Sequence, residues 1–253
     1  MRKQLVGLIV VVAVLAVGGV AIAEKPVTSV KDDVHAEFDG DFSPETLSKE
    51  KRTPISLWMQ ARIKRPDGTH VAPLKELQLE GDRDVSFSVK GIPICESRSR
   101  GRRMSPDVVR KECKESLIGR GWMDAEIAFE EQRPIPVKSE LLLFKGGFEN
   151  GVRTLYLHAY ITVPTPAAII TTVKVKRVRK GRYGLQAIAT FPKIAGGAGS
   201  ITFLKLNLEK GILSAKCPDG RLATRATATF GSTPATKLNS AVSRPCVPFL
   251  QGR

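Results

Sequence analysis

The chain has 253 residues, with 40 Lys and Arg against 25 Asp and Glu, so its formal net charge is +15. Removing residues 1–23 would leave 230 residues with a charge of +13, enough chain to bury a hydrophobic core as one large domain or two small ones. This length excludes a peptide without a core, and the charge favours anionic surroundings: acidic wall polymers, lipid headgroups or extracellular nucleic acid. Charge alone identifies none of these, because an ordinary soluble surface rich in Lys and Arg has the same composition.

Residues 1–23 have the three parts of an export signal. Arg2 and Lys3 form the positive start, residues 5–20 are an uncharged apolar run, and residues 21–23 (AIA) are a small-x-small cleavage site. We therefore expect a protein that is secreted or held at the outer face of the cell envelope. Residues 5–23 are also long enough to remain as an uncleaved N-terminal anchor. Both alternatives place residues 24–253 outside the cytoplasm.

The four cysteines all lie in the part of the chain that would be exported. An even number of cysteines in an oxidising compartment predicts disulfides. Of the three possible pairings we predict the sequence-local one, which joins Cys95 to Cys113 and Cys217 to Cys246. A zinc site is the alternative, but no Cys-x-x-Cys pair or nearby His gives the usual ligand spacing. We therefore expect no metal and no cofactor.

Alternation of apolar and polar residues predicts strands along most of the chain. The clearest example is residues 55–64, where Ile55, Leu57 and Met59 share one face. We expect residues 24–50 to form a loosely held N-terminal segment and residues 51–253 to form a single domain. The predicted strands cover residues 34–42, 55–64, 76–80, 84–90, 122–129, 139–145, 152–163, 168–178, 181–191, 200–208, 212–216, 221–230 and 236–244.

Residues 91–121 interrupt the strands with an excursion that contains a predicted helix. Ser105, Pro106 and Asp107 are typical of a helix start. Val109 and Cys113 are four residues apart, so they share a face that points toward the core, where Cys95 can reach. The predicted fold is all-β: a two-sheet antiparallel β-sandwich with one short helix in a disulfide-closed excursion.

Two basic runs are the first candidates for a binding surface. The excursion supplies a candidate anion-binding site made of Arg98, Arg100, Arg102, Arg103, Arg110 and Lys111. The alternative is a solvated loop without a ligand. The second run, residues 174–182, is interpreted as an edge hairpin protected by charge. Nucleic acid is disfavoured as a partner, because no aromatic residue stands among the arginines of the excursion to stack on bases.

Aromatic residues suggest a second candidate surface. Tyr156, His158 and Tyr160 alternate in a predicted strand and therefore share its outward face, where they can line a ligand groove. The alternative is ordinary cross-strand aromatic pairing. Trp58 and Trp122 are also predicted to face outward, as a carbohydrate-stacking site requires, but aromatic residues make up only 6% of the chain.

No catalytic residue is predicted from motifs. The sequence contains no HExxH, GxSxG or SxxK, and no unpaired cysteine remains to act as a nucleophile. A pair of glycosidase carboxylates leaves no local signature. A secreted hydrolase acting on wall glycan or ester substrates is therefore the alternative function.

Several segments in a fixed order resemble a group of exported, uncharacterised proteins of high-GC Gram-positive bacteria. They are GIPIC, LIGRGWMDAEIAF, GRYG, FPKIAGGAGSITFLKLNL, CPDG and a closing RPC, and they span most of residues 50–248. The resemblance supports export and disulfides, and it implies no activity, ligand or catalytic residue. The leading hypothesis is an exported, non-enzymatic cell-envelope or extracellular protein. Its basic loops would contact an anionic wall polymer, a lipid or a membrane surface, and its oligomeric state is not predicted.

Overall fold

The computed structural model describes residues 26–96, 104–231 and 234–249. The signal or anchor predicted for residues 1–23 lies outside the described residues. The described part of the chain is mostly strands. It also contains one α-helix, α1 (Pro106–Glu112), and two 3-10 turns, η2 (Lys114–Ser116) and η3 (Ile194–Gly197). These strands are β1 (Val27–Lys31), β2 (Val34–Ser43), β3 (Thr46–Ser48), β4 (Thr53–Lys64), β5 (Leu74–Asp82), β6 (Val85–Phe87), β7 (Leu117–Ile127), β8 (Ile135–Glu149), β9 (Val152–Ile161), β10 (Ala167–Lys180), β11 (Tyr183–Thr190), β12 (Gly199–Ala215), β13 (Arg221–Phe230), β14 (Lys237–Pro245) and β15 (Val247–Phe249).

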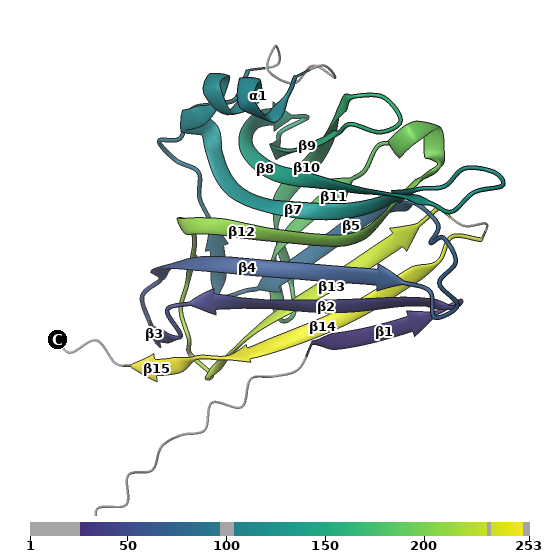
Figure 1. The fold of residues 1–253 in the computed structure, drawn as a ribbon. Coiled ribbons are helices and arrows are strands. Elements are labelled where there is room, and N and C mark those ends of the chain that lie inside the picture. The colour runs from purple at the N-terminus through teal and green to yellow at the C-terminus, as the bar shows by residue number, and fades with distance from the viewer. Residues whose placement is uncertain (1–25, 97–103, 232–233, 250–253) are drawn as a thin grey trace, which may run out of the picture.

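Nearly all of these strands belong to one continuous antiparallel sheet. Its order is β1-β2-β4-β12-β7-β8-β9-β10-β11-β5-β13-β14, and β6 pairs with β12. Figure 1 shows the sheet curling round until β14 lies beside β1 and β2, so that it forms a nearly closed barrel. The remaining strands, β3 and β15, form a small parallel pair.

The predicted two-sheet sandwich is not confirmed, because the strands form this single curled sheet instead. A sandwich and a barrel both bury one face of each strand, so alternation of residues cannot distinguish them. The length and the bending of the strands decide between a sandwich and a barrel. β8 has 15 residues and β12 has 17, and the register of each shifts along its length. Such irregularities bend a strand and increase its twist, which lets a wide sheet curl toward closure.

The N-terminal strands are part of this sheet, which differs from the loosely held segment predicted for residues 24–50. β2 pairs with β4 from His35 to Ser43 and buries Val34, Ala36 and Phe38 in the core. β1 was not predicted, because VTSVK is short and polar. It is held by pairing with β2, an interaction between neighbouring strands that its own composition does not reveal.

The short helix and both disulfides are confirmed. Ser105 precedes α1, Pro106 occupies its first turn, and Cys113 follows it and bonds to Cys95. Val109 and the disulfide pack against Leu142 and Phe144, which face outward from β8. The excursion therefore covers part of the outside of the barrel, and Figure 1 shows α1 lying against that outer side.

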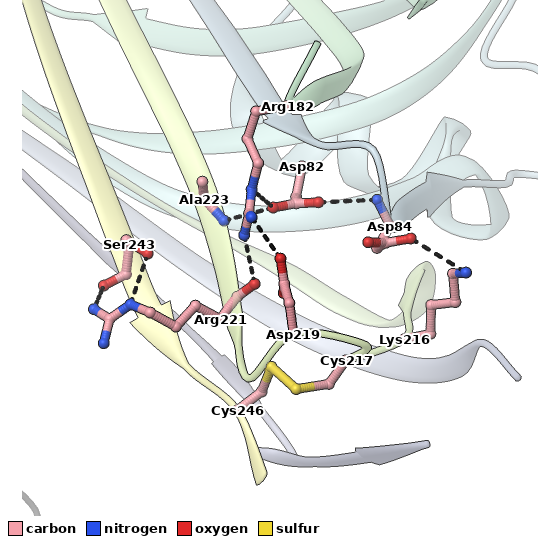
Figure 2. A network of polar contacts seen from close by, with 10 residues as sticks. All are labelled: Asp82, Asp84, Arg182, Lys216, Cys217, Asp219, Arg221, Ala223, Ser243 and Cys246. Atoms are coloured by element: carbon pink, nitrogen blue, oxygen red, sulfur yellow. Dashed lines mark hydrogen bonds and ion pairs between the residues drawn. A yellow bond between two sulfur atoms is a disulfide. The ribbon is translucent and has the colours of Figure 1, made fainter. Parts of the chain in front are cut away.

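The second disulfide, Cys217–Cys246, lies beside a polar network at one end of the barrel (Figure 2). The carboxylate of Asp82 in β5 accepts hydrogen bonds from Arg182 Nε at 2.7 Å and from the amide of Ala223 at 3.0 Å. Its other oxygen accepts a hydrogen bond from the amide of Asp84 at 3.0 Å. This network joins the ends of β5 and β13 to the turn between β10 and β11.

Candidate functional site

The interior of the barrel contains an apolar cavity of about 180 Å³. Its walls come from strands on every side of the barrel, so no single element builds it. β8 and β9 contribute Leu141 and Leu155, β12 contributes Leu206, and β4 contributes Met59. The cavity can therefore take an uncharged, water-avoiding molecule.

The cavity exists because several inward-facing side chains are too small to fill the centre. β11 points Leu185, Ala187 and Ala189 inward, and the neighbouring position on β5 is Gly81. Leucines around this gap are only half-buried although they face the interior; they are Leu57, Leu79, Leu185, Leu206 and Leu208. A close-packed core would bury them fully. This was not predicted from the sequence, and the available signal is the run of small inward residues in YGLQAIAT.

One end of the barrel is packed in the ordinary way. Ile127, Phe230 and Ile201 are at most 2% exposed there, and Ile194 of η3 is buried with them. The cavity lies between this packed end and the end that carries the Asp82 network. The cavity is therefore confined to one part of the barrel interior and does not reflect loose packing throughout the core.

A seam without backbone pairing borders the cavity. No ladder joins β14 to β1 or β2 within the described ranges. The amides of Gly40 and Phe42 instead donate to the carboxylates of Asp39 and Asp41, each at 2.8 Å. Because these amides are already satisfied, the edge of β2 has fewer donors left for a ladder with β14.

Arg244 crosses this seam from β14. Its Nε donates to the carbonyl oxygen of Gly40 at 2.7 Å, and its guanidinium pairs with the carboxylate of Asp39. Farther along, Ser29 of β1 donates to the carbonyl oxygen of Asn239 at 2.5 Å. Arg244 and Asp41 are the charged residues of the cavity lining, so polar groups gather at the seam while the rest of the lining is almost entirely apolar.

The predicted groove residues lie beneath the excursion. Tyr156 and His158 are at most 5% exposed, and Tyr160 is half-buried. The Nε2–H of His158 donates to the carbonyl oxygen of Met104 at 2.9 Å, so the chain before α1 lies over this ring. The three side chains therefore do not line an open groove, because the disulfide-held segment covers the face that they share.

Burial sets the protonation state of His158. With the Nε2 proton donated to Met104, Nδ1 is unprotonated and has no hydrogen-bond partner among the described residues. Adding a proton to Nδ1 would bury an unpaired charge. Burial therefore lowers the pKa of the imidazole, although the Met104 carbonyl and the charge of Glu140 act in the opposite direction.

Most of the predicted anion-binding loop lies outside the described residues. Arg98, Arg100, Arg102 and Arg103 belong to residues 97–103, so their role stays a prediction. Lys111 is exposed on α1. Arg110 donates to the carboxylates of Asp107 at 2.8 Å and Glu140 at 2.9 Å. The hydrogen bond to Asp107 raises the pKa of Arg110, and these two acids already neutralise its charge.

A Ser-His-Glu cluster that the sequence did not indicate lies at the packed end of the barrel. Ser200 Oγ is 3.1 Å from His70 Nε2, and His70 Nδ1 is 3.6 Å from Glu126. The Ser200 hydroxyl donates to the carbonyl oxygen of Val71, so Nε2 must carry the proton that it shares with Oγ. In a catalytic triad the serine hydroxyl instead donates its proton to an unprotonated Nε2 of the histidine. Ser200 is also 0% exposed, so the cluster has no access to substrate.

The two tryptophans face outward, but a lysine lies between them. The ammonium of Lys205 is 5.1 Å from the ring centre of Trp58 and 5.2 Å from that of Trp122. The two rings therefore form cation–π contacts with Lys205. Trp58 and Trp122 therefore do not offer the two free ring faces on which a sugar could stack.

Comparison with known proteins adds no relative. No protein-family model, curated protein or solved structure matches the chain. The resemblance to exported proteins of high-GC Gram-positive bacteria stays a prediction. Within the described ranges no group of His, Cys, Asp and Glu is arranged to hold a metal ion, and no helix is long and apolar enough to cross a membrane.

Proposed function

We propose that this chain is an exported, non-enzymatic protein of the cell envelope or extracellular space that binds a hydrophobic molecule, such as the acyl chain of a lipid, inside its barrel. The observation that carries this proposal is the apolar cavity of about 180 Å³. An engineered apolar cavity of about 150 Å³ stays dry and binds benzene. A cavity of this size and lining therefore favours hydrocarbon over water.

The character of the lining supports a lipid-like ligand over a sugar or an anionic polymer. Leucine, valine, alanine and phenylalanine supply most of its surface. A polar ligand would lose its hydrogen bonds to water and find few replacements there. Two disulfides and the predicted export signal fit a protein that works in an oxidising compartment.

Binding of the apolar fluorophore N-phenyl-1-naphthylamine tests the proposal. The cavity should take up the dye and raise its emission in a saturable way. Ala187→Phe places a ring in the cavity and should weaken binding by about tenfold or more, the equivalent of 1.4 kcal/mol. Because the ring fills empty space, the melting temperature should not fall.

Gln186→Phe is the matched control. It introduces the same ring one residue away in β11, on the outer face of the strand, and should leave dye binding unchanged. Absence of saturable uptake by the natural protein would refute the proposal. Equal affinities of the two variants would show that the dye binds elsewhere.

A further inference from the structure

A basic surface with an exposed aromatic residue lies at the end of β8, β9 and β10. We call it the rim patch and define it by Phe148, Arg153, Lys174, Lys176, Arg177 and Arg179. Register places these residues at the same strand ends: Arg153 is opposite both Phe148 on β8 and Val175 on β10. Lys174 and Lys176 alternate with Val175 and therefore lie on the other face of β10. The patch shares no residue with the anion-binding loop predicted in the excursion.

The cations of the rim patch have no acidic partners among the described residues. On β11, the residues opposite Lys174, Lys176 and Arg177 are Ile188, Gln186 and Leu185. On β9, the residue opposite Lys174 is Thr154. Glu149 is the nearest acid along the chain, and it accepts a hydrogen bond from Tyr156 at 3.2 Å. The five cations therefore stand beside a single nearby acid, Glu149, and most of the positive charge is uncompensated.

Protection of a free sheet edge explains only part of this charge. Lysines often shield edge strands from pairing with other chains. β10 pairs with β11 up to Lys180 but with β9 only as far as Val175, so from Lys176 onward its β9 side is a free edge. The interpretation of residues 174–182 as an edge hairpin therefore stays a prediction for residues 176–180, whereas Lys174 and Arg153 lie where strands pair on both sides.

Phe148 is an exposed apolar side chain within the rim patch. It is 64% exposed, the largest exposed fraction among the large hydrophobic side chains of the described residues. The guanidinium of Arg153 lies 5.0 Å from its ring centre. A ring held beside cations at a surface is the arrangement that enters the headgroup region of an anionic bilayer, where the ring is dehydrated and the cations meet phosphates.

The rim patch also adjoins the cavity. Val175, Leu155 and Leu185 line the cavity, and the next paired residues are already cations: Arg153 faces Val175, and Arg177 faces Leu185. The apolar lining therefore passes into the basic rim within one strand pair. We infer that the rim patch docks the protein on an anionic lipid bilayer, with Phe148 inserted among the headgroups and the adjoining cavity turned toward the lipid.

Flotation with vesicles tests this docking independently of dye binding. The protein should float with vesicles of phosphatidylglycerol and phosphatidylcholine at about 0.1 M salt, and much less with phosphatidylcholine alone. Each basic residue near such a surface contributes about fivefold in affinity. The triple variant Lys176→Ser, Arg177→Ser, Arg179→Ser should therefore bind about 100-fold more weakly.

The matched control removes the same charge at the opposite strand ends. Lys31, Lys64 and Lys193 are exposed there, and their triple serine variant should lose little binding. Equal losses in both triple variants would overturn the inference, because attraction would then follow net charge alone. Binding to a soluble anionic polysaccharide but not to vesicles would overturn it as well.

A tryptophan at position 148 tests insertion directly. In Phe148→Trp, vesicles with brominated acyl chains should quench the added emission, measured as the difference from the unsubstituted protein, whose own tryptophans lie on β4 and β7. Flotation without quenching of this added ring would reject insertion of Phe148. Failure of vesicle binding with intact dye uptake would reject the docking surface and leave the proposed cavity function standing.

Discussion

Two contacts between strands of this barrel carry similar ion pairs but differ in the backbone pairing around them. Between β5 and β13, Arg225 Nε donates to Glu80 at 2.6 Å across a regular antiparallel ladder. Between β2 and β14, Arg244 pairs with Asp39 where no ladder joins the strands. The same kind of charged pair therefore adds to an existing connection in one place and helps to form the connection in the other.

The difference shows that the stabilising effect of an ion pair depends on its surroundings. Arg225 is 43% exposed and its guanidinium competes with water, although its partner Glu80 is only 10% exposed, whereas both side chains of the seam pair, Arg244 and Asp39, are largely buried at 10% and 14%. Exposed pairs contribute little to stability, and breaking a buried pair leaves an unpaired charge. The laddered contact has its own buried carboxylate, Asp82, at the end of β5.

The largest effect is expected at Asp82, which is 1% exposed and accepts three hydrogen bonds. Asp82→Ala removes all three and leaves Arg182 without one of its partners. We expect the free energy of unfolding to fall by about 3–5 kcal/mol, measured by urea denaturation with the disulfides intact. A loss below about 1 kcal/mol would mean that this network behaves like a surface pair.

A smaller effect is expected from the seam. A double-mutant cycle with Asp39→Asn and Arg244→Met should give a coupling energy of about 2–3 kcal/mol, because both groups are largely buried. The matching cycle with Glu80→Gln and Arg225→Met should give a smaller coupling energy, about 1 kcal/mol, because water screens the 43% exposed guanidinium of Arg225 although Glu80 is buried. Both cycles can be measured by urea denaturation. Equal coupling energies would remove the distinction between seam and ladder.

The smallest effect is expected from pH, through His158. Because burial lowers its pKa in the folded protein, the unfolded chain takes up a proton first as the pH falls below about 6.5. Stability should be full above this pH and decrease as the pH falls toward the folded pKa. His158→Gln keeps a donor for Met104 without titrating, so it should reduce this slope in thermal melts recorded from pH 7.5 to 5.

His35→Gln provides the control, since it changes the same residue type on the outward face of β2. His158 lies under the excursion, away from the seam and from the ladder. His158→Gln should therefore reduce the dependence of the melting temperature on pH by the same amount whether the protein also carries Asp39→Asn or Glu80→Gln. A slope that disappears only in the Asp39→Asn background would assign the pH dependence to the seam instead.

The sequence by itself determined the local features of this protein. Alternation identified the inward faces of the long strands, because side chains of a strand point alternately to its two sides. The signals at Ser105 and Pro106 located the helix, and the short loops between the cysteines led to the correct disulfide pairs. Each of these depends on residues close together in the chain.

Only the tertiary structure decided how the strands close and what the closure leaves empty. Whether the sheet splits into a sandwich or curls into a barrel depends on bends in β8 and β12 and on contacts between β2 and β14, such as the one that joins Gly40 to Arg244, 204 residues apart. The cavity depends on small residues of β11 meeting Gly81 of β5, and the covered groove depends on the chain before α1 crossing His158. Alternation gives the direction of a side chain, but it does not show which distant residue lies opposite or whether any atom fills the space between them.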